Sequence, residues 1–249
     1  MPQAGGMDQF KSSAFQNRCI GITGASGAFG RALTRCCRAG GAEVVGLTHS
    51  TPPQDQGDEG PHRWISWRCG DEKALDGELA TFDVLVLNHG INPKGGQSND
   101  DINRSLEINA LSGWRLMQRF EEISRCSTRK GPVEIWVNTS EAEIQPAVSP
   151  VYEISKRLLG QLVSLRGATL DEAARKKLII RKLVLGPFRS ELNPIGIMDA
   201  NWVAQQVLRQ ASWGLRLIIV TPNPLTYLLM PITELGRRAY SQLLNRRDP

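Results

Sequence analysis

The fold class of this chain is decided by residues 19–33, CIGITGASGAFGRAL. Residues 19–23 predict a short buried strand. Residues 24–30 then place a glycine at every third position, and residues 28–39 follow with the pattern of a helix. A strand that enters a glycine-rich turn and then a helix is the local context of a dinucleotide-binding site.

Each glycine of this turn has a physical task. Gly24 permits a tight turn, Gly27 lets the backbone approach a pyrophosphate, and Gly30 lets the helix pack closely on the strand. The phosphate would then sit at the positive end of the helix dipole. The cofactor contacts predicted from this turn are Gly24, Ser26, Gly27, Ala28, Phe29 and Gly30.

Strand and helix patterns alternate along the rest of the chain. Further strands are expected at 43–47, 63–67, 83–87, 133–138, 178–185 and 217–220, with helices at 101–126, 150–165 and 199–211. Such alternation predicts an α/β fold with a single doubly wound parallel sheet (Rossmann fold), about seven strands and helices on both faces. We expect a flexible leader over 1–17 and one domain over 18–249, ending in a substrate lid and tail.

Composition excludes several classes of protein. The chain has 249 residues, of which 41% are hydrophobic and 22% charged, as is ordinary for a globular domain. Its five cysteines form no CxxC pair, which argues against a disulfide framework and against a metal site. No run of about 18 apolar residues and no apolar signal segment occur, so we expect a cytoplasmic chain without a transmembrane helix.

The charge balance argues against a nucleic-acid partner. The net charge is +5, from 30 basic and 25 acidic residues. The basic residues are dispersed among acids, and no RNA-binding or zinc-finger motif accompanies them. This balance fits a solvated surface and the binding of an anionic cofactor.

The end of the second predicted strand selects between NAD and NADP. NAD-binding folds usually place an Asp or Glu there to hold the ribose hydroxyls. This chain has Thr48, His49 and Ser50 instead, so no carboxylate repels a 2′-phosphate. We therefore expect NADP, held by these three residues with Arg31 or Arg35 in reach, although NAD is also compatible.

A second motif is the pair Tyr152 and Lys156. A spacing of four residues puts both side chains on one helix face. A tyrosine with an ordinary pKa near 10 works poorly as an acid or base at neutral pH, and a cation beside it lowers that pKa. The pair opens the helix after the fifth strand, at the edge where open α/β sheets bind ligands.

These two motifs, in this order, resemble the short-chain dehydrogenase/reductase family over residues 18–222. Further matches are Asn88-His89-Gly90 after the fourth strand, Asn109 in the long helix, and Ser140 at the end of the fifth strand. The segment 186–190 stands where the family has its Pro-Gly element. The resemblance implies further cofactor contacts from Asn88, His89, Gly90, Tyr152, Lys156, Gly186, Pro187, Phe188 and Ser190.

The resemblance also implies a reaction, namely hydride transfer between C4 of the nicotinamide and a carbonyl or alcohol carbon. Tyr152 would act as acid or base, Lys156 would hold the nicotinamide ribose and lower the tyrosine pKa, and Ser140 would orient the substrate oxygen. Asn109 would hold a water that links the lysine to solvent. Family members are commonly homodimers or homotetramers, paired through the helices that carry Asn109 and Tyr152.

The chain departs from the family pattern at several points. Thr139 lies thirteen residues before Tyr152, the commonest spacing, whereas counting along the strand puts Glu141 at the serine position. We choose Ser140, because a carboxylate would repel a developing oxyanion and alternation points Thr139 away. His89 replaces an alanine and is expected to have a packing role.

The strings around Asn88, Asn138 and Gly186 look similar to the dehydrogenase half of bacterial sterol desaturase/short-chain dehydrogenase proteins. That similarity implies an apolar or lipid-like substrate. Residues 190–200 would form an apolar lid over it. Two interpretations stay open for the apolar residues 225–231: a subunit interface or core cover, and a peripheral contact with a membrane surface.

Three functions are carried forward. The first is an NADP-dependent oxidoreductase acting on a small-molecule carbonyl or alcohol. The second is a non-catalytic NAD(P)-binding regulator, against which the presence of Tyr152 and Lys156 speaks. The third is a nucleotide-sugar epimerase or dehydratase, suggested by the glycine spacing, although such enzymes usually carry a longer C-terminal substrate domain.

Overall fold

A computed structural model of the chain describes residues 15–51 and 57–245. It contains a seven-stranded parallel sheet with the strand order β3-β2-β1-β4-β5-β6-β7, which confirms the predicted fold class. The strands are β1 (Cys19–Thr23), β2 (Glu43–Thr48), β3 (Arg63–Ser66), β4 (Val84–Leu87), β5 (Val133–Ser140), β6 (Leu178–Leu185) and β7 (Leu217–Val220).

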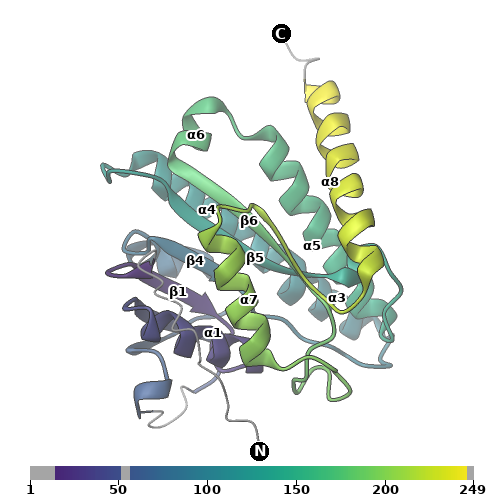
Figure 1. Ribbon diagram of the computed structural model, residues 1–249. Coiled ribbons are helices and arrows are strands. Elements are labelled where there is room, and N and C mark those ends of the chain that lie inside the picture. Colours follow the sequence, from purple (N-terminus) through teal and green to yellow (C-terminus); the bar gives the residue numbers. More distant parts are fainter. Residues whose placement is uncertain (1–14, 52–56, 246–249) are drawn as a thin grey trace, which may run out of the picture.

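Helices cover both faces of this sheet (Figure 1). They are α1 (Ala28–Ala39), α2 (Asp76–Leu79), α3 (Asn99–Leu106), α4 (Ser112–Cys126), α5 (Pro150–Thr169), α6 (Glu172–Lys177), α7 (Ala200–Ser212) and α8 (Pro224–Asn245), with one π-helical turn, η4 (Glu107–Leu111), between α3 and α4. Helices α1 and α7 lie together on one face, and α4 and α5 lie on the other. Helix α8 packs along α5.

The side chains of β5 show why both faces must be covered. All eight residues of this strand are buried. Ile135 and Val137 pack with the helices α4 and α5, whereas Trp136 packs with α1 and α7. Because successive side chains point to opposite faces, a strand that is apolar throughout needs a helical layer on each side.

Two helical regions differ from the sequence-based expectation. The helix expected over 101–126 begins at Asn99 and is interrupted by η4. A 22-residue helix, α8, occupies the tail that was expected only to be apolar, and it accommodates Pro231 in its interior. In the described part of the chain, no helix is long and apolar enough to cross a membrane.

The packed domain begins before the predicted boundary at residue 18. Phe15 is buried and its ring lies 5.8 Å from that of Trp136, edge to face. Asn17 also donates its backbone N–H to the carbonyl of Gly41 at 3.0 Å. Residues 1–14, the rest of the predicted leader, lie outside the described residues.

The strand order reverses beside β1, whose neighbours are β2 and β4. In open α/β sheets the crevice for ligands opens at such a point, beyond the carboxyl ends of the strands. The turn from β1 to α1, the end of β4 and the end of β5 therefore meet at one edge of the sheet.

Candidate active site

In the β1–α1 turn, backbone atoms lie so close together that two positions have no room for a side chain. Gly24 has φ +62°, a conformation that L side chains rarely adopt, and a Cβ there would lie 3.0 Å from the Cα of His89. A Cβ on Gly30 would lie 2.3 Å from the carbonyl oxygen of Gly24. Gly30 thus lets α1 pack onto the turn, as the sequence predicted.

The N-terminus of α1 is open to an anion. Its N-cap residue is Gly27, which offers no side-chain cap, and its first turn holds no acidic residue. The first backbone N–H groups of a helix have no partner within the helix, and the dipole favours negative charge there. The donor set and the glycine backbone therefore fit the pyrophosphate of a dinucleotide.

One cavity of about 880 Å³ collects nearly all the predicted site residues. Those that line it are Gly24, Ser26, Gly27, Ala28, Phe29, Thr48, His49, Ser50, Asn88, His89, Gly90, Ser140, Tyr152, Lys156, Gly186, Pro187, Phe188 and Ser190. The two that do not line it are Gly30, which lies under the turn, and Asn109.

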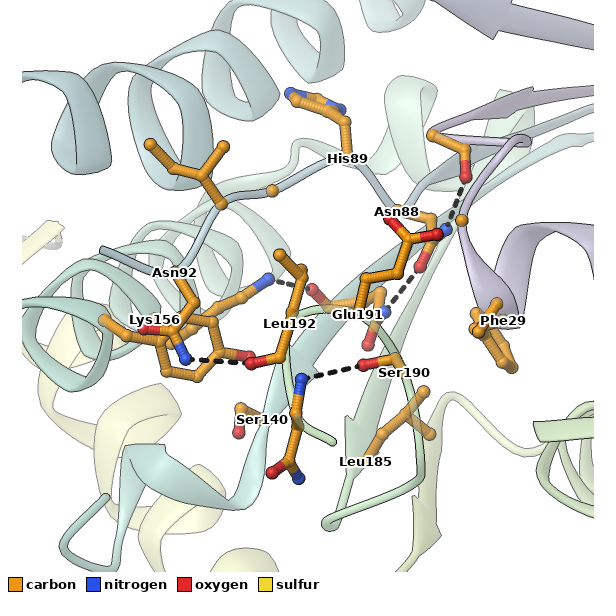
Figure 2. Close-up of a pocket in the computed structure, with 18 of the residues that line it drawn as sticks. Phe29, Asn88, His89, Asn92, Ser140, Lys156, Leu185, Ser190, Glu191 and Leu192 are labelled. Atoms are coloured by element: carbon orange, nitrogen blue, oxygen red, sulfur yellow. Dashed lines mark hydrogen bonds between the residues drawn. The ribbon is translucent and has the colours of Figure 1, made fainter. Parts of the chain in front are cut away.

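A chain of hydrogen bonds joins the ends of three strands to the lysine. Asn88 donates to the carbonyl of Gly24 at 3.2 Å, and Asn138 donates to the side-chain oxygen of Asn88 at 2.7 Å. Lys156 in turn donates to the carbonyl of Asn138 at 3.1 Å (Figure 2). These hydrogen bonds fix the position of the lysine ammonium beneath the crevice. Asn138, which the sequence singled out only as part of a similar string, is a central member of this chain of hydrogen bonds.

Ser140 and Tyr152 both line the cavity, and the hydroxyl of Ser140 lies close enough to the phenol to lower its pKa. Burial raises the pKa of Tyr152, and Ser140 lowers it only in part. Burial also lowers the pKa of Lys156 to about 8. The lysine ammonium lies 5.9 Å from the centre of the tyrosine ring. The expectation that Lys156 depresses the tyrosine pKa is thus not met, because burial of the phenol is the dominant influence on that pKa.

The structure separates the three candidates for the family serine. Thr139 donates its hydroxyl to the carbonyl of Leu183 at 3.1 Å, on the neighbouring strand. The carboxylate of Glu141 accepts a hydrogen bond from the hydroxyl of Thr221. Of the three, Ser140 is the one whose hydroxyl lowers the pKa of Tyr152.

Asn109 lies in the π-helical turn η4, and its side chain holds the loop after β4. Its amide oxygen accepts from the backbone N–H of Ile91 at 2.7 Å, and its amide nitrogen donates to the carbonyl of the same residue at 2.9 Å. A Cβ on Gly90 would lie 3.0 Å from this amide oxygen. The side chain of Asn109 therefore shapes the cavity wall from behind, and a water-binding role stays a prediction.

At the adenosine end, the hydroxyls of Thr48 and Ser50 lie 3.1 Å apart and line the cavity. The two predicted arginines point elsewhere. Arg31 donates to the carbonyl of Ser26, and Arg35 contacts Asn201 and Glu59. Neither arginine lines the cavity, because each is bonded within its own surroundings.

The cation that the cavity does present at this end is Arg68. It follows β3, whose last residue pairs with Thr48, and its side chain is exposed. Sequence analysis missed it because no motif marks the residue after the third strand.

His89 is buried beside this end of the cavity. Its Nδ1 lies 2.8 Å from the hydroxyl of Thr23, and burial lowers its pKa to about 3. The imidazole is therefore neutral at physiological pH.

The substrate end is covered by the segment after β6 (Figure 2). Asn92 donates to the carbonyl of Leu192 at 3.2 Å, which ties the loop after β4 to the predicted lid. Leu192 and Ile195 line the cavity, as expected for the lid, whereas Met198 packs into the core. Ser149 also lines the cavity, and its hydroxyl is buried without a partner among the described residues.

Comparison with known proteins now assigns the family. The model described as "NAD dependent epimerase/dehydratase family" matches residues 20–163, more than half of the chain. The chain belongs to this family. Its membership confirms the resemblance to short-chain dehydrogenases/reductases and shows that the chain belongs to an NAD-dependent family.

A relative supports this assignment. The "Monoglucosyldiacylglycerol epimerase" of Synechocystis sp. (strain ATCC 27184 / PCC 6803 / Kazusa) is 40% identical over 238 residues, which cover 94% of this chain and 57% of that protein. The chain thus spans little more than half the length of this relative.

Among solved structures, a short-chain dehydrogenase from Sphingobium yanoikuyae in complex with NADPH gives a TM-score of 0.73 at 16% identity, covering 90% of this chain and 94% of that one. The bulky-bulky ketone specific alcohol dehydrogenase from Comamonas testosteroni gives 0.72 at 17% identity, covering 88% and 92%. At these identities the two structures show the shared fold alone.

Proposed function

We propose that this protein is an NADP-dependent oxidoreductase of the short-chain dehydrogenase type that acts on the alcohol or carbonyl group of an apolar, lipid-like substrate. One observation carries the proposal: Ser140, Tyr152 and Lys156 line one cavity, which begins at an open helix N-terminus, and the lysine ammonium lies 5.9 Å from the centre of the tyrosine ring.

The roles of the residues follow from their positions. The nicotinamide, when bound, supplies the chemistry of accepting or donating a hydride at the substrate carbon. Tyr152 gives its proton to the carbonyl oxygen during reduction and takes the alcohol proton during oxidation. Ser140 orients that oxygen by hydrogen bonding. Lys156, held by the carbonyl of Asn138, contributes positive charge and a donor toward the ribose.

The choice of NADP rests on the adenosine end. Thr48 and Ser50 offer hydroxyls there, and Arg68 offers a guanidinium that no hydrogen bond or ion pair engages among the described residues. An arginine binds a phosphate with two parallel donors, so it favours a cofactor with a 2′-phosphate.

A second candidate is the inversion of a sugar carbon in a glycolipid headgroup. The name of the 40% identical relative favours it, since that protein is an epimerase of a glucosyl lipid. The same residues serve both reactions. In an epimerase the hydride that leaves the carbinol carbon returns to the opposite face of the ketone, so the cofactor shows no net change.

One experiment separates the two functions. The purified chain is incubated with NADP⁺ or NADPH and either a long-chain alcohol or ketone or monoglucosyldiacylglycerol in mixed micelles. Oxidoreductase activity changes the absorbance at the nicotinamide band in step with product. Epimerase activity converts the glucosyl headgroup to an epimeric sugar, seen by NMR of the headgroup, without that change. Failure of every substrate, in folded protein that binds NADPH, would overturn both.

A further inference from the structure

The mouth of the cavity is rimmed by apolar side chains that face solvent. Val148, Leu192 and Ile195 line the cavity, yet 93%, 41% and 76% of their surfaces are exposed. A residue that both lines a cavity and is exposed lies at its opening. Ile197, in the same lid segment, is 71% exposed. We call these four residues the apolar rim.

Helix α8 begins beside the loop that leads to this rim. The side that packs on α5 carries Thr226, Met230 and Glu234, all buried. The opposite side carries exposed apolar residues at helical spacing, and with 100° per residue they cover about a third of the circumference. They are Leu225, Leu228, Leu229, Ile232, Leu235, Ala239 and Leu243. We call this the outer face of α8.

The rim and the helix are physically joined. Gln145, in the loop that leads to Val148, donates to the hydroxyl of Thr226 at 2.8 Å. Asn223, just before α8, donates to the side-chain oxygen of Gln145 at 2.6 Å. Figure 1 shows the start of α8 at the same end of the molecule as this loop.

We infer that the apolar rim and the outer face of α8 dock on the surface of a lipid bilayer, so that a lipid substrate enters the cavity from the membrane. This inference rests on the proposed function for its lipid substrate. The docking itself is a property of the surface and is measured without turnover.

A bilayer fits this surface better than a second protein. A partner helix buries a narrow seam, whereas here the apolar arc is broad and extends to separate loops. A protein that covered the rim would also close the cavity against substrate. A bilayer covers the same residues and supplies the substrate through them.

The charges exposed on α8 also favour a bilayer. Within the described part of α8 the one exposed charged residue is Arg238, whereas Glu234 is buried among cations. The chain as a whole carries +5. The outer face of α8 therefore presents no exposed carboxylate that would repel anionic headgroups, and in the lid the exposed Arg189 stands against the exposed Glu191 and Asp199.

The test is co-sedimentation of the full chain, with NADPH present, with vesicles of phosphatidylcholine alone and with added phosphatidylglycerol. Wild-type protein should sediment with the vesicles, more strongly when they are anionic. The double variant Leu228→Glu/Ile232→Glu should lose at least about tenfold in partitioning, because two exposed apolar side chains become charged. Its activity on a water-soluble carbonyl should not change.

A matched control places the same two charges elsewhere. Trp213 and Leu215 are exposed at the end of α7, just before the amino end of β7, and thus at the sheet edge opposite the cavity. Trp213→Glu/Leu215→Glu should sediment with vesicles like the wild type. All variants are compared by circular dichroism and light scattering.

Three outcomes would overturn the inference. The folded wild type does not sediment with either vesicle; the Leu228/Ile232 variant sediments as well as the wild type; or that variant turns a dimer into a monomer with no wild-type binding to vesicles, which would assign the face to a second copy. Vesicle binding by the folded wild type, together with an absence of wild-type turnover on every alcohol, ketone and lipid tested, would instead reject the proposed function and leave the docking intact.

Discussion

The cofactor end and the substrate end of this cavity are built by different means. At the cofactor end, backbone meets backbone, as at Gly24 and Gly30, where a Cβ would come within 3.0 Å and 2.3 Å of main-chain atoms. At the substrate end, the loop after β5 and the helix α8 are held by side chains that come from distant parts of the chain.

A buried ion cluster illustrates the second kind of construction. Lys182 on β6 donates to Glu143 and to Glu234 at 2.7 Å each, and Arg237 donates to the same two carboxylates at 2.7 and 3.1 Å. Glu143 lies in the turn that follows Ser140. The cluster therefore connects α8 to the loop beside the reacting groups.

The two ends of the cavity should therefore differ in how well they tolerate amino-acid substitutions. A cradle made of glycine backbone admits few substitutions and binds a part common to all dinucleotides. A loop held by side-chain pairs can be reshaped by a few substitutions, which suits the part of the cavity that must differ from one substrate to the next.

The largest effect is expected from Tyr152→Phe, which tests the residue proposed as acid and base. We expect turnover to fall by about 10³- to 10⁴-fold, because the proton donor is lost, with the dissociation constant for NADPH within about twofold of wild type. Steady-state kinetics and fluorescence titration measure the two quantities. Tyr240→Phe, at a residue 67% exposed on α8, is the control. Retained turnover would reject Tyr152 as the acid and base.

The ion cluster gives the next largest effect. Lys182→Met leaves Glu143 and Glu234 buried with one cation, and breaking a buried pair costs about 3–5 kcal/mol of unfolding free energy. Urea denaturation measures this loss. Lys176→Met, which removes an exposed partner of Glu172, should change it by less than about 0.5 kcal/mol.

Lys182→Met also tests whether the cofactor end and the substrate end of the cavity are independent of each other. If the cluster positions the loop after β5, Lys182→Met raises KM for the substrate while NADPH affinity stays near the wild-type value. An equal loss of affinity for both ligands would show that the two ends are not independent.

The sequence predicts the elements that local patterns define, and it does not predict those that depend on contacts between distant residues. The bounds of β1, α1, β6 and β7 agree with the expectation, because glycine turns and apolar runs are local signals. The ion cluster was not foreseen, since it joins residues up to 94 positions apart. Helix α8 was missed because its apolar residues lie mostly on the exposed side, where no buried face marks the helical period, and because Pro231 interrupts the pattern.

Lys156 should make the unfolding free energy of the protein depend on pH. Burial lowers its pKa from 10.5 to about 8, so the folded state holds this proton less tightly than the unfolded state. The lysine therefore destabilises the fold below pH 8, and this penalty is relieved as the pH rises toward 10.5.

Lys156→Met should accordingly raise the unfolding free energy at pH 7 by about 2 kcal/mol, after loss of the hydrogen bond to Asn138, while abolishing turnover. The gain should shrink above pH 8 and be absent near pH 10.5, as urea titrations at each pH would show. A variant less stable than wild type at pH 7 would mean that the ammonium stabilises the fold.

The smallest effect is expected at the adenosine end, from Arg68→Ala. Here the sequence offered Arg31 and Arg35, but their guanidiniums are engaged elsewhere, whereas Arg68 lines the cavity. Removal of one exposed cation from a phosphate should cost about 1–1.5 kcal/mol, so affinity for NADPH falls roughly tenfold and affinity for NADH stays the same. Fluorescence titration with both cofactors measures the ratio. Arg104→Ala, at another cation of the cavity wall, is the control. An equal loss for NADPH and NADH would show that Arg68 contacts a part that both cofactors share, and the cofactor end would then rest on backbone alone.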